Sequence, residues 1–557
     1  MPPQDLGRKS LLLLASTWSG SALGMIVSIL IGRMMGPAAL GSIAFSTGLV
    51  GLVMAALLPG FSQAHLKRLS EGQDAGRCIG TMAAIQLALQ GVLLAAVAST
   101  RSRQLVFFTD VGAVFVLLLV AQVANNFADV FLKVFVAREW IVPHSIILLA
   151  SRVGRLLATL AVLGWAPRIE WIAATFVLDG LLSGLGAVLT LALWYDIVPR
   201  LPTRQSFGAY WSYARPFLVN TPLALFQDSI DRVVVGRWVG LTAAGYYQVA
   251  RTLWEALSSV IAAPAIFLFT RLSRLYSQRS PARDREAREF FFGSFDKLLF
   301  ITIPLAFGFW ASAELGIALL FGEPFRPAAV PLRVLILATL VANVVNPYTL
   351  ILYALDQAGR FIRVNVIRVM VYSMALAVLV PPDGAVLGIA GLWPGAPGAA
   401  AARLVLVLLP CWIYFRWSRD LAGIPFYPRT WAYLGGFGLL LVAFHTLVIA
   451  IGLLGMGPSL ATIPAAIVSL GLYLVYLFQI HPGTRENLRY FLVLFSPADF
   501  IRFLRSGSWS ETFAPPASQR TLPWAENRSP EWRSSRSADR AARKSPRDSA
   551  AGPAASR

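Results

Sequence analysis

The sequence predicts an all-α integral membrane protein with about 14 transmembrane helices. Three observations lead to this class: 57% of the 557 residues are hydrophobic, only 14% are charged, and long apolar stretches follow one another along most of the chain. A soluble domain carries charge on about a quarter of its residues. So little polar surface cannot cover the apolar residues, and lipid must therefore act as the second solvent.

A helix needs about 20 mostly apolar residues to cross the hydrocarbon. The first run, from Leu11, is longer than the apolar core of a cleaved signal peptide, and we interpret it as a span. Pro394 and Pro397 interrupt the run before the twelfth span and leave its boundary open. The predicted spans are residues 11–32, 38–60, 79–98, 111–128, 146–165, 171–193, 216–239, 243–269, 298–318, 335–355, 364–380, 398–415, 431–453 and 460–478.

Lysine and arginine residues near the span ends predict the orientation. With the N-terminus in the cytoplasm, 23 of these residues fall on the cytoplasmic side and 7 fall outside. Several of the 23 belong to a predicted cytoplasmic loop at residues 271–297. Because cytoplasmic loops carry the excess of positive charge, both termini are expected in the cytoplasm. The outer loops are all short, which counts against a glycan polymerase or ligase. No nucleotide-binding G-x-x-x-x-G-K-[ST] pattern is present either, and we expect no enzyme activity.

The four histidines and two cysteines are scattered and have no metal-ligand or disulfide spacing, so neither a metal nor a cofactor is expected. Residues 485–505 mix Leu and Phe with Arg, which is typical of an interfacial helix bound to anionic membrane lipids. From about Ser506 onward the chain is rich in Ser, Pro, Ala and Arg, and we expect a disordered cytoplasmic tail. That tail carries part of the net charge of +20, which therefore does not indicate nucleic-acid binding.

An internal repeat links two predicted hairpins. Residues 31–41 read I-G-R-M-M-G-P-A-A-L-G, and residues 235–245 read V-G-R-W-V-G-L-T-A-A-G. Five positions match at a constant offset, 236 − 32 = 204. The hairpins lie six spans apart, so the two copies have the same orientation and predict a pseudo-twofold axis along the membrane normal. The glycines also permit a tight turn and close helix contact, and both interpretations can hold together.

Three segments of the sequence carry a family resemblance. They are D-R-V-V-V-G-R-W-V-G-L-T-A-A-G-Y-Y-Q-V-A-R-T-L at residues 231–253, F-G-E-P-F-R-P-A-A-V-P-L-R-V-L at residues 321–335, and Y-A-L-D-Q-A-G-R at residues 353–360. The first resembles the hairpin typical of polysaccharide and O-antigen flippases, whose superfamily also holds multidrug and toxin extrusion transporters and the lipid II flippase. With the repeat and the number of spans, the likeness covers roughly residues 11–478.

The resemblance implies two pseudo-twofold-related six-helix lobes, residues 1–200 and 201–416, and a C-terminal helix pair, residues 417–482. Residues 483–557 hold the interfacial helix and the tail. It also implies a flippase in the bacterial inner membrane that moves an undecaprenyl-diphosphate-linked oligosaccharide from the cytoplasmic to the periplasmic leaflet. Its product would serve surface polysaccharide or exopolysaccharide assembly, with polysaccharide polymerase and chain-length machinery as partners. Fold alone does not settle the substrate.

Ionisable side chains inside the predicted spans are the candidate substrate-binding residues, because charge within a membrane is expensive. Arginine can hold a phosphate through two parallel hydrogen bonds. The candidates in spans 7 and 8 are Asp228, Asp231, Arg232, Arg251 and Glu255. Further candidates in other spans are Arg152, Arg155, Asp179 and Arg403.

Two interpretations of the charges in spans 7 and 8 stay open. Asp228 and Arg232, like Arg251 and Glu255, are spaced as ion pairs on one helix face, so the five groups could simply neutralise one another and hold the hairpin together. Their formal charge, −3 + 2 = −1, would instead suit a carboxylate that exchanges a proton or a cation during transport.

Two other functions remain as alternatives to the flippase. A cation-coupled multidrug exporter of the same superfamily would be favoured by an acid deep in the first lobe, where Asp179 is the candidate. A membrane glycan polymerase or ligase is the less favoured of the two, because the outer loops are short.

Overall fold

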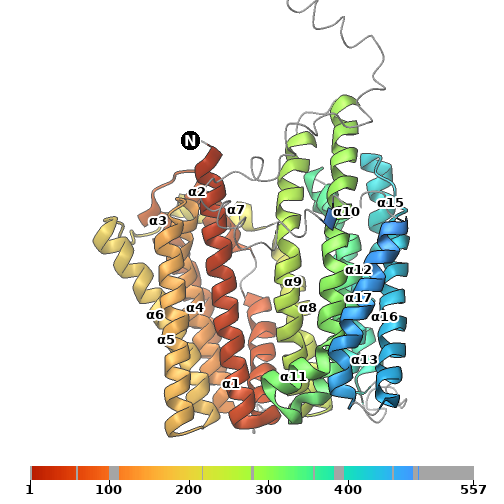
Figure 1. Ribbon diagram of the computed structural model, residues 1–557. Coiled ribbons are helices and arrows are strands. Elements are labelled where there is room, and N and C mark those ends of the chain that lie inside the picture. Colours follow the sequence, from red (N-terminus) through yellow and green to blue (C-terminus); the bar gives the residue numbers. More distant parts are fainter. Residues whose placement is uncertain are drawn as a thin grey trace, which may run out of the picture. The chain divides into compact units, whose positions relative to one another are not determined.

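The computed structural model describes residues 3–57, 60–99, 112–215, 217–276, 281–355, 358–381, 394–454, 457–480 and 487–488. Every regular element in these ranges is a helix (Figure 1). Eleven of the helical segments are long and apolar enough to cross a membrane. The predicted all-α membrane fold is therefore confirmed, whereas the number of 14 spans stays a prediction. The predicted interfacial helix and tail lie outside the described residues, except for residues 487 and 488.

The first two predicted spans form one element, α1 (Pro3–Leu57), which Figure 1 shows as two helices joined by a turn. Gly36 breaks the helical path with φ 82° and ψ −179°. Glycine adopts a positive φ without steric cost, and the proline that follows it suits the first turn of the next helix because no hydrogen-bonded N–H is needed there. A short helix, α2 (Phe61–Ser70), continues this second half.

Four long helices complete the first half of the chain, and each overlaps a predicted span. They are α3 (Ala75–Ser99), α4 (Gly112–Ala137), α5 (Ile141–Trp165) and α6 (Ile169–Trp194). α6 packs along both α4 and α5. Gly180 of α6 permits this approach, since a β-carbon there would lie 2.8 Å from that of Ala124 on α4.

The second half contains five long helices and α14, and these pack against one another. They are α8 (Phe217–Trp238), α9 (Leu241–Tyr276), α10 (Pro281–Ala311), α12 (Ala329–Ala354), α13 (Ala358–Leu379) and α14 (Ala396–Leu408). α9 contacts α8, α10, α12 and α14, while α13 contacts α8 and α14. The shorter α11 (Ala313–Phe321), the 3₁₀-helix η2 (Glu323–Ala328) and α15 (Cys411–Ala422) connect them.

The prediction of a loop at residues 271–297 is wrong for most of that segment. α9 extends to Tyr276, and α10 already begins at Pro281, 17 residues before the predicted span that starts at residue 298. Hydropathy detects only the apolar part of a helix, and the charged residues at positions 283–289 extend α10 beyond it. α10 also ends at Ala311, where the predicted span continued to residue 318.

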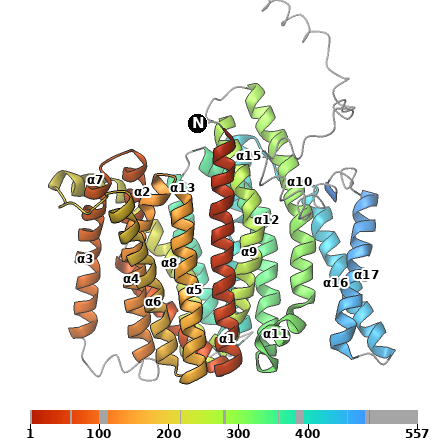
Figure 2. The same ribbon diagram turned by 60° about the vertical axis from the view of Figure 1, so that its left-hand side comes forward.

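The last two helices, α16 (Thr430–Leu453) and α17 (Pro458–Ile480), lie side by side and both contact α10 (Figure 2). They correspond to the predicted C-terminal pair. The domain boundaries themselves stay a prediction. The connecting helix α7 (Arg204–Ala214), assigned to the second lobe from the sequence, packs on α2 and α3 of the first half.

The two copies of the repeat contact each other. A β-carbon on Gly41 would collide with the backbone carbonyl of Leu241, and one on Gly245 would collide with that of Pro37. These residues are repeat partners, since 245 − 41 = 204 and 241 − 37 = 204. Reciprocal contacts of this kind are what a twofold axis produces. The symmetry predicted from the sequence is thus present in the packing of the two hairpins.

We expect Gly41→Ala to destabilise the protein, because the added methyl group must displace backbone at the crossing of the hairpins; overpacking of this kind costs about 1–3 kcal/mol. Gly24→Ala is the matched control, since a β-carbon there meets no atom within 4 Å and alanine is intrinsically the better helix former. Thermal unfolding of the purified variants in detergent measures the difference. Equal midpoints for the two variants would contradict the close crossing.

Candidate functional site

Asp231 of α8 is fully buried and accepts hydrogen bonds from three other helices. Its Oδ2 accepts from Arg403 of α14 at 2.6 Å, from Tyr247 of α9 at 2.7 Å and from Tyr372 of α13 at 3.1 Å. Its Oδ1 lies 3.4 Å from a guanidinium nitrogen of Arg251. A buried carboxylate is tolerated only with such partners. One side chain therefore joins α8, α9, α13 and α14.

Arg251 of α9 has a protein acceptor for each of its three side-chain nitrogens. Nε donates to Glu255 at 2.6 Å, Nη2 to the Asp228 carboxylate at 2.6 Å, and Nη1 to the Asp228 carbonyl at 2.7 Å. Only 4% of the side chain is exposed. The predicted ion pair between Arg251 and Glu255 is confirmed. A bound phosphate would have to displace these acceptors, so the geometry favours a structural role for Arg251.

The predicted ion pair between Asp228 and Arg232 is corrected by the structure. The Asp228 carboxylate pairs with Arg251, and Arg232 Nη2 donates instead to the Asp228 backbone carbonyl at 3.0 Å. The spacing of four residues places Arg232 near Asp228 on α8. Because α9 packs against α8, Arg251 also reaches the Asp228 carboxylate and forms the ion pair with it. Arg232 is half-buried, and its Nε is a buried donor that lacks an acceptor among the described atoms. Its guanidinium is thus the least engaged in this group.

Asp228 and Glu255 point toward an exposed region, with 56% and 52% of their side chains accessible. Both belong to helices predicted from the sequence as spans 7 and 8, although α8 and α9 are not among the eleven described helices that are long and apolar enough to cross a membrane. Carboxylates at that depth face water or a polar ligand and not lipid. These two side chains, with Arg232, therefore border the accessible part of the site.

Arg403 completes the charge balance of the group. Three carboxylates and three arginines now sum to −3 + 3 = 0, whereas the five residues recognised in spans 7 and 8 summed to −1. Asp231 is already neutralised by two tethered guanidinium groups. The geometry therefore gives no support to Asp231 as a carboxylate that exchanges a proton or a cation.

The aromatic residues of this site were not recognised from the sequence. Tyr247 precedes Arg251 by four residues, so their shared helix face could have indicated the contact. Tyr372 and Trp254 gave no such signal; the Arg403 guanidinium lies 5.3 Å from the centre of the Trp254 ring and 5.9 Å from that of Tyr372. Cations over aromatic rings gain additional stabilisation when water is excluded.

The candidate charges of the first half form a separate group on α5 and α6. Asp179 is buried and lies 2.8 Å from Arg152 and 3.7 Å from Arg155. The Arg155 guanidinium also stacks 3.5 Å from the centre of the Phe176 ring. Among the described residues, Asp179 pairs with the arginines of this group, whereas Asp231 pairs with Arg251 and Arg403 of the other group. Asp179, the acidic residue on which the drug-exporter alternative depended, is thus already paired with arginine.

The charged part of α8 lies against the second half of α1, which belongs to the other repeat. A β-carbon on Gly48 would lie 3.0 Å from the Ser229 carbonyl and 3.1 Å from the Arg232 β-carbon, and one on Gly51 would collide with the Ser229 hydroxyl. Small residues at these positions let the two helices approach closely. Arg232 is therefore located where the two repeats meet.

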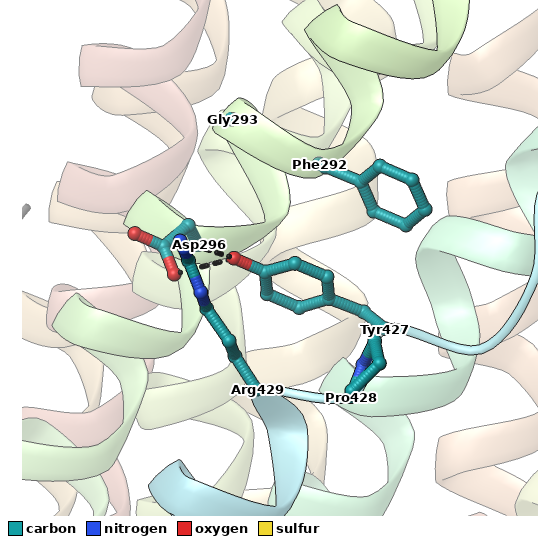
Figure 3. A pocket seen from close by; sticks show the side chains of 6 residues that line it. All are labelled: Phe292, Gly293, Asp296, Tyr427, Pro428 and Arg429. Atoms are coloured by element: carbon teal, nitrogen blue, oxygen red, sulfur yellow. Dashed lines mark hydrogen bonds between the residues drawn. The ribbon is translucent and has the colours of Figure 1, made fainter. Parts of the chain in front are cut away.

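A pocket of about 400 Å³ lies elsewhere and contains none of the predicted site residues (Figure 3). Its lining is Phe292, Gly293, Asp296, Tyr427, Pro428 and Arg429. Asp296 of α10 accepts hydrogen bonds from Tyr427 at 3.0 Å, Tyr433 at 3.1 Å and Asn487 at 2.7 Å. Burial raises the pKa of the Tyr427 phenol to about 12, which keeps it a donor at neutral pH. This cluster attaches the last helix pair to α10.

Comparison with known proteins gives a match of part of the chain to one sequence family, and a fold that is shared with solved structures. Residues 145–330 match the sequence pattern of the family described as "Polysaccharide biosynthesis protein". The structure of the lipid II flippase MurJ in an inward closed conformation is similar, with a TM-score of 0.64 and 13% identity over 84% of this chain and 98% of that one. No curated protein matches the sequence.

Two transporter structures are also similar. A multidrug resistance MATE family transporter of the MOP superfamily in an inward-facing conformation gives a TM-score of 0.54, with 14% identity over 72% of this chain and 94% of that one. An outward-facing conformation gives 0.51, with 14% identity over 76% and 96%. At these identities the likeness concerns the fold alone. The matched segment, residues 145–330, is about a third of the chain and contains the α8–α9 hairpin with its charges, and the shared fold extends over most of the rest.

Proposed function

We propose that this protein is a flippase that moves an undecaprenyl-diphosphate-linked oligosaccharide from the cytoplasmic to the periplasmic leaflet of the bacterial inner membrane. The observation that carries the proposal is the family match over residues 145–330, which includes Asp228, Asp231, Arg232, Arg251 and Glu255. The lipid II flippase, which shares the fold, supports it. The translocated unit would then serve surface polysaccharide or exopolysaccharide assembly.

Such a transporter must move the charged headgroup of its lipid substrate through the apolar interior of the membrane. A sugar diphosphate cannot cross bare hydrocarbon, because removing water from an anion costs many kcal/mol. The protein must offer a polar surface while the lipid tail stays in the bilayer. Asp228 and Glu255 provide half-exposed polar groups at membrane depth. Arg232 provides a guanidinium that can hold the diphosphate through charge-assisted hydrogen bonds.

The two alternatives have less support. A cation-coupled drug exporter needs a carboxylate that is available for exchange, and both buried candidates, Asp179 and Asp231, are paired with arginine. A polymerase or ligase would act on acceptors at the outer surface, where the predicted loops are short. We further propose that both termini lie in the cytoplasm and that the product passes to polymerase and chain-length machinery.

Deletion of the encoding gene tests the function. We expect the strain to lose its surface or extracellular polysaccharide and to accumulate the lipid-linked oligosaccharide in the cytoplasmic leaflet, with both effects reversed by the wild-type gene. Glycosyltransferase products must still be made, which lipid extraction and mass spectrometry of the oligosaccharide establish. Unchanged polysaccharide together with increased sensitivity to cationic drugs would favour the exporter instead.

The membrane potential is expected to drive transport without another gradient. Outward movement of a diphosphate runs from the negative to the positive side and gains about 2.3 kcal/mol per charge at 100 mV. Proteoliposomes given a potassium diffusion potential should therefore flip the substrate faster than the same vesicles without one. If an imposed potential has no effect while a sodium or pH gradient accelerates flipping, a coupling ion must be bound at a site other than the arginine-paired Asp231.

A further inference from the structure

A row of polar side chains runs along one face of α4, within the apolar span Gly112–Ala137. Its members are Gln122, Asn126, Asp129 and Lys133. With about 100° between successive residues of a helix, the spacing of four, three and four places them within roughly 60° of one another and over about 16 Å of its length. We call this row the α4 polar face.

Contacts show where the α4 polar face is directed. Asn126 Nδ2 lies 3.6 Å from the sulfur of Met54, in the second half of α1, and the Ser62 hydroxyl donates to Asp129 at 3.2 Å. Met54 lies about one helix turn after Gly51, which packs against α8 of the other repeat. The row therefore lies beside α2 and the end of α1, about one helix turn beyond the part of α1 that meets α8.

The α4 polar face is accessible at a depth where lipid would be a poor solvent for it. All four side chains are half-buried, and 51% of the Asp129 side chain is exposed. Polar and ionised groups inside a span face other protein or a water-filled cavity, because hydrocarbon cannot satisfy them. The opposite side of α4 carries exposed valines, among them Val120 at 38%. The helix thus has a polar face and an apolar face that are both accessible.

The chemistry of the row fits neutral hydroxyl groups better than phosphate. Gln122 donates to Asn126 at 2.9 Å, and Lys133 pairs with Asp129, so these polar contacts run along α4 and the row has no net charge. Each amide offers two donors and an oxygen acceptor, more groups than these contacts engage. Such groups can bind sugar hydroxyls, which both donate and accept, whereas a diphosphate needs excess positive charge.

We propose that the α4 polar face binds the sugar portion of the transported headgroup, while the diphosphate lies nearer to Arg232 of the second repeat. The proposal rests on the proposed flippase function. It assigns recognition of the sugar to the first half of the chain, apart from the Arg232 site that holds the diphosphate. With the predicted orientation, Lys133 lies toward the cytoplasm, so the row leads from the cytoplasmic end of α4 toward its middle.

Cysteine labelling in the full-length protein tests this inference. Cys78 and Cys411 are first replaced by serine, and single cysteines are then introduced at Gln122, Asn126 and, as a matched control on the opposite face, Val120. A membrane-impermeant maleimide is applied to inside-out vesicles, and labelling is compared at equal protein level. Because maleimide reacts with water-exposed thiolates, we expect Gln122→Cys and Asn126→Cys to be labelled about tenfold faster than Val120→Cys.

Protection then identifies the ligand. We expect the lipid-linked oligosaccharide, extracted from a deletion strain, to suppress labelling at Asn126→Cys, and undecaprenyl phosphate, which has no sugar, to leave it unchanged. Equal protection by both lipids would contradict sugar recognition and leave the flippase function intact. Labelling equal to that of Val120→Cys, or protection by neither lipid, would contradict the proposed sugar site. The flippase function fails as well only if the deletion strain keeps its polysaccharide.

Discussion

Replacing Arg403 with alanine is expected to remove most of the folded protein from the membrane. Arg403 donates to the fully buried Asp231 at 2.6 Å and to the Gln227 carbonyl at 3.0 Å. Its loss leaves the Asp231 carboxylate with two tyrosines and a more distant guanidinium. Breaking a buried ion pair by removing one partner costs about 3–5 kcal/mol, a large part of the stability of an ordinary domain.

The amount of monodisperse protein after detergent extraction and its thermal midpoint measure this effect. Arg416→Ala is the matched control on the neighbouring α15, where the pair with Asp420 spans 3.7 Å and both side chains are more than half exposed. Exposed pairs contribute about 0–1 kcal/mol. Adding Asp231→Asn to Arg403→Ala should recover part of the loss, because the uncompensated charge is removed. Equal stability of Arg403→Ala and Arg416→Ala would show that Asp231 does not depend on this partner.

Arg232→Ala is expected to have the opposite phenotype, with normal amounts of folded protein and a loss of transport. Arg232 is half-buried at the contact between the repeats, and within the described part of the chain its side chain donates a single hydrogen bond, to a backbone carbonyl. A hydrogen bond to a charged group contributes about 1.5–3 kcal/mol, so losing the grip on the diphosphate should slow export about tenfold to a hundredfold. Arg232→Lys keeps the charge without the planar fork and should be intermediate.

Polysaccharide output divided by the amount of membrane protein is the quantity to compare. Arg363→Ala, at an exposed position of α13, serves as the control for loss of an arginine. Arg251→Ala should instead reduce the amount of folded protein, since its nitrogens hold Asp228 and Glu255. If Arg232→Ala transports normally and a well-folded Arg251→Ala does not, the diphosphate is held by Arg251 and the assignment of the two arginines must be exchanged.

The sequence was informative about helices and repeats because both leave a local pattern. Apolar length located the long helices, even α8 and α9 with their charges, and an offset of 204 residues predicted the twofold relation of the two hairpins. The start of α10 was missed, because a helix that leaves the bilayer keeps its shape but loses its hydropathy. Arg403 was a candidate, but its partner Asp231 lies 172 residues earlier, and no local spacing connects them.

Which charge pairs with which is a property of the packed structure. The i,i+4 spacing suggested Arg232 as the partner of Asp228, and only the position of α9 decides for Arg251. The α4 polar face, in contrast, was within reach of sequence reasoning. Its four residues recur at helical spacing, but the predicted span ended at residue 128, before Asp129 and Lys133, and Gln122 and Asn126 carry no charge.

The most direct test of the flippase account is transport by the purified protein. Proteoliposomes are loaded with the lipid-linked oligosaccharide, a potassium diffusion potential is imposed, and a membrane-impermeant glycosidase is added outside to measure the accessible fraction over time. The account predicts that this fraction rises well above that of protein-free vesicles and that Arg232→Ala slows the rise. An accessible fraction equal to that of protein-free vesicles, with wild-type protein shown to be folded, would contradict it.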